Sequence, residues 1–266
     1  MQYDLVKDRF ARLIDNFPFF RKLFYLLLDL LLLRQWYVKS KMKKAYSKND
    51  KIKFYDAGAG FGQYSWFVLQ YFRKAQVHAV DLKTDYMNSF AHYCANLPEK
   101  NFTAQQADLV DYTPNEKYDL IIAVDILEHI ENDEQVLANF RRAISPGGKL
   151  IISSPSTFDE SAKFVAEHVR PGYSKAEICS KLENANFKVN SFEYSYGKMG
   201  HIYWLLAMKW PLKIVDIHKA LLLFLPIYYL IFYPIAFIFM CLDFYGYNHV
   251  GTGVIVVAEA EAEDKV

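Results

Sequence analysis

Three glycines at alternate positions, Gly58, Gly60 and Gly62, follow a short apolar run that ends in Asp56. Glycine tolerates backbone angles that other residues avoid and has no side chain, so such a loop can turn sharply and lie close to a ligand. A helix that begins directly after the loop points its free N-terminal amides at the same ligand. Asp81 ends the next apolar run, 21 residues after Gly60, where its carboxylate can accept hydrogen bonds from both hydroxyls of a ribose. These residues predict a nucleotide-binding site.

Two motif families combine a glycine loop with a later acid in this way. The dinucleotide-binding fingerprint GxGxxG requires a glycine at position 63, which here is Gln63. The observed GxGxG spacing instead resembles the class I S-adenosylmethionine-dependent methyltransferases, whose first motif is DxGxGxG and whose second is an acid that ends strand two. The resemblance covers residues 51–196, with a last strand returning at 251–259. It continues in Ala107-Asp108-Leu109, in YDLIIAVDILEHI and in SPGGKLIISSPS.

These motifs require a scaffold, and the chain between 51 and 196 supplies short apolar runs that alternate with helix-like stretches. Such alternation is typical of βαβ units. We therefore predict an α/β fold with a doubly wound, seven-stranded, mostly parallel sheet of the Rossmann-like methyltransferase type. FKVNSFEYSY is the expected sixth strand and GTGVIVVAEA the seventh. The predicted organisation is an N-terminal helical and basic extension at 1–50, the core at 51–197, a hydrophobic helical insert at 198–250, and the last strand with an acidic tail at 251–266.

The resemblance implies that the cofactor is S-adenosyl-L-methionine and that its methionine part lies on the glycine loop. Gly58, Gly60 and Gly62 would line that part of the cofactor. Asp56 would lie beneath the loop and contact the amino group directly or through the loop. Asp125, which ends strand four, would lie near the same end of the cofactor, although an ordinary cap or turn acid is the alternative interpretation.

The adenosine part of the cofactor is assigned to four other residues by the same resemblance. Asp81 would bind the ribose, and the neighbouring Leu82 would face the adenine. Asp108 would accept a hydrogen bond from the adenine amino group, while Leu109 would donate its backbone amide to the ring. A turn acid is the alternative for Asp108.

Methyl transfer requires that a nucleophilic atom be held in line with the methyl group, about 3 Å away, with water excluded. A weak nucleophile such as a phenol also requires a base. Glu128 and His129 resemble the residues that border the acceptor in quinone-type members, some of which also hold a divalent metal. His168 is the alternative base. The alternative interpretation of Glu128 and His129 is that both cap the following helix. The alternative for His168 is a surface or helix-end histidine. We predict no metal, because no second cluster of ligands is visible.

The composition limits the function classes. The chain has 266 residues and a formal net charge of +1, so its overall charge gives no case for binding nucleic acid. Hydrophobic residues make up 53% of the sequence, which excludes disorder. Three scattered cysteines form no disulfide framework. The first residues, MQYDLVKDRFARLIDNF, mix acids and bases before any apolar run, so we expect no secretory signal.

Residues 220–242 contain no charge and are long enough to cross a bilayer. A single crossing would leave the last strand on the wrong side of the membrane. Because Pro226 and Pro234 divide the run, we expect short, bent helices that lie in the interface. Lysines at 198, 209, 213 and 219, with seven more between 39 and 53, would attract an anionic surface. The alternative interpretation of the lysines between 39 and 53 is a solvated linker. The alternative interpretation of the insert is a buried subdomain.

The leading functional hypothesis is O-methylation of a lipid-like, isoprenoid or aryl-lipid acceptor by a cytoplasmic enzyme peripheral to the cytoplasmic face of a membrane. Its partners would be a hydrophobic acceptor and the membrane surface, and the sequence does not predict the oligomeric state. Three alternatives remain open: C-methylation of a quinone precursor, a soluble small-molecule methyltransferase, and a non-catalytic binding protein with the same fold.

Overall fold

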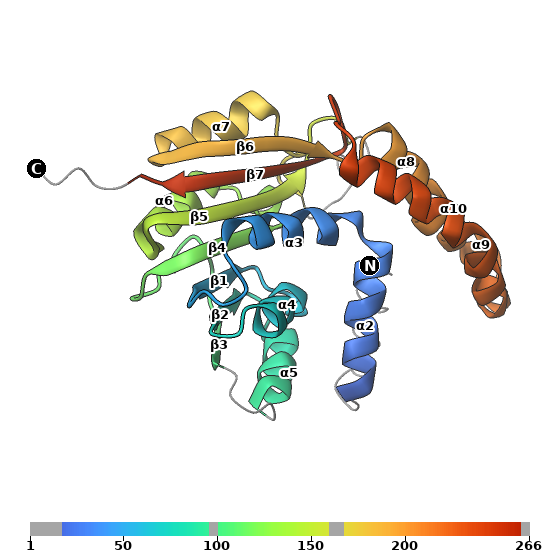
Figure 1. Ribbon diagram of the computed structural model, residues 1–266, viewed down its shortest axis with the longest axis horizontal. Helices are drawn as coiled ribbons and strands as arrows, with labels where there is room; N and C mark the ends of the chain where they lie inside the picture. Colours follow the sequence, from blue (N-terminus) through green and yellow to red (C-terminus); the bar gives the residue numbers. More distant parts are fainter. Residues whose placement is uncertain (1–17, 96–100, 160–167, 262–266) are drawn as a thin grey trace, which may run out of the picture.

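A seven-stranded sheet with the order β3-β2-β1-β4-β5-β7-β6 forms the centre of the molecule (Figure 1). The structure, a computed structural model, describes residues 18–95, 101–159 and 168–261. The expectations for the N-terminal residues 1–17 and for the acidic tail at 262–266 therefore lie outside the described residues. The strands are β1 Lys53–Ala57, β2 Gln76–Asp81, β3 Asn101–Gln106, β4 Tyr118–Val124, β5 Ile144–Pro155, β6 Phe187–Ser195 and β7 Gly253–Ala260.

The sheet is parallel from β3 through β5, and β7 runs antiparallel to both of its neighbours, β5 and β6. The chain order reverses between β1 and β4, since β2 and β3 lie on one side of β1 and the later strands lie on the other. In doubly wound sheets the ligand binds at the carboxyl ends of the strands beside such a reversal. The predicted fold class is confirmed.

Each face of the sheet carries its own hydrophobic core. Phe54 and Ile122 belong to one core, whereas their chain neighbours Tyr55 and Ile121 belong to the other. The central strands are therefore almost uniformly apolar, as expected for parallel strands buried on both faces. The first face is covered by α4 Gln63–Tyr71, α5 Thr84–Ala95 and the N-terminal helices; the second by α6 Asp133–Ala143 and α7 Lys175–Asn184.

The N-terminal extension consists of two helices, α2 Pro18–Leu31 and α3 Leu33–Ala45, which meet at a bend (Figure 1). Helix α3 packs against the sheet through Leu33, Val38 and Met42, all of which are fully buried. Since residues 33–45 are helical, the linker interpretation of the lysine-rich segment is wrong for its first half, residues 39–45.

Contacts within the protein occupy much of the predicted basic cluster at 39–53. Ion pairs join Lys39 to Asp29, Lys41 to Glu193 and Lys53 to Glu116. Lys43 lies 5.5 Å from the ring centroid of Phe67, and Lys48 lies 5.9 Å from that of Tyr71. Since these lysines already have partners within the protein, the cluster is weak support for membrane attraction.

The insert forms a helical hairpin that projects from the sheet (Figure 1). Its outgoing arm comprises α8 Lys198–Trp204, a π-helical segment η3 Leu205–Lys209 and α9 Trp210–Ile217; a 3-10 segment η4 Lys219–Phe224 forms the tip, and α10 Leu225–Tyr245 returns. The expectation that Pro226 and Pro234 break the run into short pieces is wrong, because α10 is continuous over 21 residues. Pro226 lies in the first helical turn, where its missing amide hydrogen costs nothing.

The base of the hairpin is buried and its outer half is exposed. Ala236, Met240 and Asp243 of α10 are buried, whereas Leu223 and Leu230 are 80% and 78% exposed. Within the described residues, one helical stretch, Lys219–Tyr245, is long and apolar enough to cross a membrane, with a mean hydropathy of 2.2 and 6% of its most apolar window buried. The buried-subdomain interpretation therefore does not hold for the outer half.

Candidate functional site

The glycine loop lies at the carboxyl end of β1 and adopts a conformation that favours glycine. Gly58, Gly60 and Gly62 have φ angles of 77°, 52° and 74°, in the region that other residues rarely adopt. A Cβ atom on Gly58 would lie 2.8 Å from the side chain of Ile126, and one on Gly62 would lie 2.5 Å from the ring of Phe90. The fold therefore requires glycine at both positions for packing as well as for backbone angle.

Gly60 and Asp81 form the part of the loop that fits a ribose. The amide of Gly60 donates a hydrogen bond of 2.8 Å to Asp81 Oδ2, and the amide of Lys83 donates one of 2.8 Å to Oδ1. A Cβ on Gly60 would meet no atom within 4 Å, so this side of the loop faces open space. Leu82, beside Asp81, is 63% exposed. A carboxylate, an open loop and an exposed apolar side chain together fit a nucleoside.

Asp108 and Leu109 follow β3 at the same edge of the sheet. Asp108 Oδ1 accepts a hydrogen bond of 2.9 Å from the amide of Val110, which is a turn contact. Leu109 is buried, and its carbonyl accepts a hydrogen bond of 2.9 Å from Asn139 Nδ2. The structure therefore shows Asp108 as a turn acid, and its predicted contact with the adenine remains a prediction.

Asp56 lies beneath the loop, as expected, and holds the start of the next helix. Its Oδ2 accepts hydrogen bonds of 3.1 Å and 2.6 Å from the amide and the hydroxyl of Ser65, in the first turn of α4. Burial raises the pKa of this carboxyl to about 7, although the Ser65 hydrogen bonds favour its ionised form. Asp56 can therefore act on the cofactor through the loop that it supports.

Asp125 connects the glycine loop to the N-terminal extension. It directly follows β4 and has a positive φ of 50°, and the next residue, Ile126, packs against Gly58. Arg34 of α3 forms an ion pair with Asp125 Oδ2. Oδ1 is buried and accepts no hydrogen bond from residues 18–95, 101–159 or 168–261. No sequence signal pointed to Arg34, which lies 91 positions before its partner.

Glu128, His129 and His168 come together although the third lies 39 residues after the second. One ligand atom from each of the three side chains lies within 4.8 Å of the others, and the two imidazole centroids are 4.5 Å apart. Glu128 is buried and accepts a hydrogen bond of 2.9 Å from Ser154 Oγ. Two imidazoles and a carboxylate are a donor set that can hold a divalent cation.

The interpretation of Glu128 and His129 as caps of the following helix is wrong. Asn132 caps α6, since its side chain accepts a hydrogen bond of 3.3 Å from the amide of Gln135, so neither Glu128 nor His129 caps that helix. His168 is partly buried, and its Nδ1 is buried and finds no hydrogen-bond partner in the part of the chain that the structure describes. Its role as a base stays a prediction.

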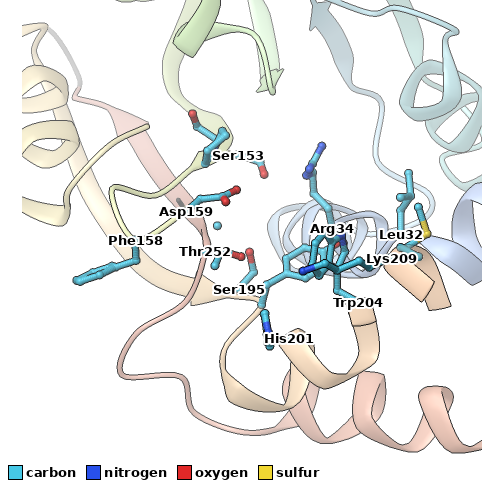
Figure 2. Close-up of a pocket in the computed structure, with 15 residues that line it drawn as sticks. Leu32, Arg34, Ser153, Phe158, Asp159, Ser195, His201, Trp204, Lys209 and Thr252 are labelled. Carbon is cyan, nitrogen blue, oxygen red and sulfur yellow. The ribbon is translucent and has the colours of Figure 1, made fainter. Parts of the chain in front are cut away.

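A cavity of about 570 Å³ lies beside Asp125, between the end of β5 and the base of the insert. Figure 2 shows Arg34, Trp204 and Lys209 grouped on one side, with Asp159 and Thr252 across from them. Ser153 and Ser154 form part of its wall, and they contact Asp125 and Glu128 respectively. The cavity therefore reaches from the expected methionine end of the cofactor to the hairpin. Sequence reasoning missed it, because its walls come from segments distant along the chain.

Comparison with known proteins places this site in a family. Residues 55–150 match the model of the family described as a methyltransferase domain. A ubiquinone biosynthesis O-methyltransferase of Rickettsia bellii (strain OSU 85-389) is 24% identical over 68% of this chain and 78% of its own length. A malonyl-[acyl-carrier protein] O-methyltransferase of Ilyobacter polytropus is 23% identical over 54% of this chain and 56% of its own.

Among solved structures, the fold is similar to that of phosphoethanolamine N-methyltransferase 2 of Haemonchus contortus in complex with S-adenosyl-L-methionine. The TM-score is 0.58 with 16% sequence identity, over 83% of this chain and 51% of that one. At this identity the likeness concerns the fold, whereas the matched domain and the named relatives concern the activity. The glycine loop, Asp81 and the sheet topology agree both with the likeness in fold and with the activity of the matched domain and the relatives. The chain carries a methyltransferase domain at residues 55–150, and this domain, the relatives and the fold agree that it is a methyltransferase that uses S-adenosyl-L-methionine as its cofactor.

Proposed function

We propose that this enzyme methylates an oxygen of a hydrophobic acceptor while its helical hairpin is docked on a membrane surface. One observation carries the proposal: the apolar, exposed outer half of the hairpin begins where the cavity beside Asp125 ends. An acceptor that leaves the lipid along the hairpin would therefore reach the cofactor site without crossing open solvent.

The hairpin geometry suits attachment to one face of a membrane. The chain goes out through α8 and α9 and comes back through α10, so β7 rejoins the sheet on the side that it left (Figure 1). The residues around the tip are large and apolar, including Ile217, Leu222, Leu223 and Phe224. An apolar element of this shape inserts into the interfacial region without spanning the bilayer.

Two exposed lysines near the tip, Lys213 and Lys219, support docking of the hairpin on the anionic leaflet of a membrane. Each cation close to an anionic leaflet contributes about 1 kcal/mol of attraction, and the cytoplasmic leaflet is the anionic one. We therefore propose peripheral attachment at the cytoplasmic face.

The relatives favour oxygen as the methylated atom. Both sequence relatives named above are O-methyltransferases, one of ubiquinone biosynthesis and one of malonyl-[acyl-carrier protein]. The first name points to an acceptor with a ring hydroxyl, and the exposed hairpin suits an acceptor with an apolar tail.

The residues of the glycine loop and of the cluster of Glu128, His129 and His168 can perform this reaction. When bound, S-adenosyl-L-methionine supplies a methyl group that is electrophilic because it is attached to a sulfonium. Gly58 and Gly62 give the loop its shape, Gly60 leaves the open side of the loop free for the cofactor, and Asp81 holds the ribose. His168 Nδ1, buried and without a described partner, takes the proton of the acceptor hydroxyl as its oxygen attacks. Glu128 and His129 orient the acceptor beside it.

The test is transfer of isotopic label from S-adenosyl-L-methionine into an organic extract of the source cell's membranes. We expect label in the organic phase with the wild type, and a loss of at least 10-fold with Asp81→Asn, because its neutral amide accepts weaker hydrogen bonds from the ribose. Mass spectrometry of the labelled species identifies the acceptor. Label that enters only water-soluble compounds would overturn the proposal.

A further inference from the structure

We propose that the cavity between β5 and the insert binds the head group of the acceptor and that this head group is acidic, a carboxylate or a phosphate. The inference rests on the proposed function, since it assigns a place and a charge to the acceptor that the enzyme would methylate. It concerns residues of the cavity wall that belong to neither the glycine loop nor the cluster of Glu128, His129 and His168.

The charge of the cavity wall favours an anion. Three basic side chains line it, those of Arg34, His201 and Lys209, against one carboxylate, that of Asp159. Asp125 offsets the charge of Arg34 in part. No carboxylate of the described chain pairs with Lys209, whose Nζ lies 5.2 Å from the ring centroid of Trp204. A half-buried ammonium beside an aromatic ring, without a counter-ion among the described residues, is a strong attractor for an anionic group.

The backbone of the insert is distorted where it lines this cavity. Leu205–Lys209 form a π-helical turn, a rare conformation that occurs mostly at functional sites. In an α-helix, residues five apart lie about 140° apart around the axis, so Trp204 and Lys209 would face different directions. The wider π-turn brings both side chains to the cavity wall.

Two tyrosines of α10 hold this distortion in place. Tyr228 Oη donates a hydrogen bond of 2.7 Å to the carbonyl of Leu206, and Tyr229 Oη donates one of 2.9 Å to the carbonyl of Ala207. Since the hydroxyls satisfy carbonyls of the π-turn, the returning arm of the hairpin fixes the position of Lys209. The lysine is thereby presented by a supported element rather than by a free surface turn.

The remainder of the wall accommodates the apolar part of an amphiphile. Leu32, Trp204 and Met208 line the same cavity and lead toward the exposed outer half of the hairpin. An acceptor bound with its acidic group between Arg34 and Lys209 would therefore extend its tail along the insert. Its reactive hydroxyl would lie on the side of Asp125 and the cofactor.

The experiment measures binding of single-chain amphiphiles to the full-length protein by calorimetry, each below its micelle concentration and without methyl transfer. The probes share a twelve-carbon chain: dodecanoate, dodecyl phosphate, dodecyltrimethylammonium and dodecyl maltoside. We expect both anions to bind the wild type at least 10-fold more tightly than the cationic and neutral probes. The stronger of the two anions identifies the head group as a carboxylate or a phosphate.

Lys209→Gln should remove most of this preference, lowering the affinity for the anions by about 10-fold, and Lys209→Arg should retain it. Lys198→Gln, an exposed lysine of α8 outside the cavity wall, is the matched control and should leave all four affinities unchanged. Equal binding of all probes by the wild type, or equal effects of the two glutamine variants, would overturn the inference. If the protein prefers anionic probes but methylates no lipid, the anion site stands and the proposed function is overturned. If it methylates lipid but shows no preference for anionic probes, the proposed function stands and the anion site is overturned.

Discussion

The hydroxyl of Tyr25, in α2, donates a hydrogen bond of 2.6 Å to the backbone carbonyl of Phe61, in the middle of the glycine loop. The ring of Phe24 also packs edge-on against Phe61, with centroids 5.3 Å apart. Burial raises the pKa of Tyr25 well above its usual value, so its hydroxyl keeps its proton at physiological pH. The N-terminal extension therefore contacts the glycine loop directly.

Tyr25→Phe tests this role of the extension. Removal of the hydrogen bond should cost about 1 kcal/mol of unfolding free energy and, by loosening the loop, about 5- to 10-fold in cofactor affinity measured by calorimetry. Tyr93→Phe is the matched control, because the buried Tyr93 hydroxyl has no hydrogen-bond partner among the described residues. That variant should be neutral or more stable. Equal cofactor affinity of the two variants would show that the extension does not act on the loop.

Gly60→Ala should separate cofactor binding from stability. Both Gly60 and Gly147 have positive φ angles, and a Cβ on either one meets no atom within 4 Å. Alanine at each position should therefore lower the unfolding free energy, measured by chemical unfolding, by about 1–2 kcal/mol through backbone strain. Alanine at 60, however, would project into the space assigned to the cofactor and should lower its affinity by at least 10-fold. If Gly60→Ala loses the expected stability but keeps its affinity for the cofactor, the cofactor does not bind at this loop.

Asp56 should make the protein less stable as pH rises. Its pKa is about 7 in the folded state, against 3.8 for the unconstrained group, so between pH 4 and pH 7 the unfolded chain releases a proton that the folded chain retains. At about 1.4 kcal/mol per pH unit, the contribution lost over this window is about 4 kcal/mol. Above pH 7 the effect levels off.

The measurement for Asp56 is urea unfolding of the wild type and of Asp56→Asn from pH 4 to pH 8. The difference in unfolding free energy between the two proteins isolates this carboxyl from all other titrating groups. The wild type should lose stability relative to the variant across the window. Parallel pH profiles would mean that Asp56 stays ionised when buried.

Leu223→Glu tests the docking role of the hairpin tip. The side chain is 80% exposed, so the substitution should change the unfolding free energy by less than about 0.5 kcal/mol. Co-flotation with anionic vesicles should fall at least 10-fold, because a carboxylate would have to enter the apolar part of the interface. Asn184→Glu, which adds the same charge at an exposed position of α7, is the control. An equal effect of both variants would mean that net charge, and not the tip, governs binding.

The sequence predicted those parts of the site that depend on local spacing. The glycine loop and Asp81 were predictable because a fixed chain distance separates two strand ends of one βαβ unit. Arg34 was not, because its pairing with Asp125 depends on how α3 crosses the sheet.

The insert shows a different limit of sequence reasoning. Pro234 suggested a break, yet α10 continues through it, because tertiary contacts on both sides of the proline hold the helix. Tyr233 Oη donates a hydrogen bond of 2.7 Å to the carbonyl of Leu30, and Phe237 packs against Trp36. The π-helical turn that orients Lys209 likewise depends on tyrosines about 20 residues later, which no local pattern reveals.

Methyl transfer measured with the acceptor either in vesicles or in detergent tests whether the enzyme takes its acceptor from a membrane. Wild type and Leu223→Glu would each receive labelled S-adenosyl-L-methionine and the membrane extract, reconstituted in anionic vesicles or dispersed in detergent. If the hairpin tip docks on the membrane, we expect equal rates for the two proteins in detergent and at least a 10-fold lower rate for Leu223→Glu with vesicles. Equal rates in vesicles, or label found only in water-soluble products, would contradict an enzyme that takes its acceptor from a membrane.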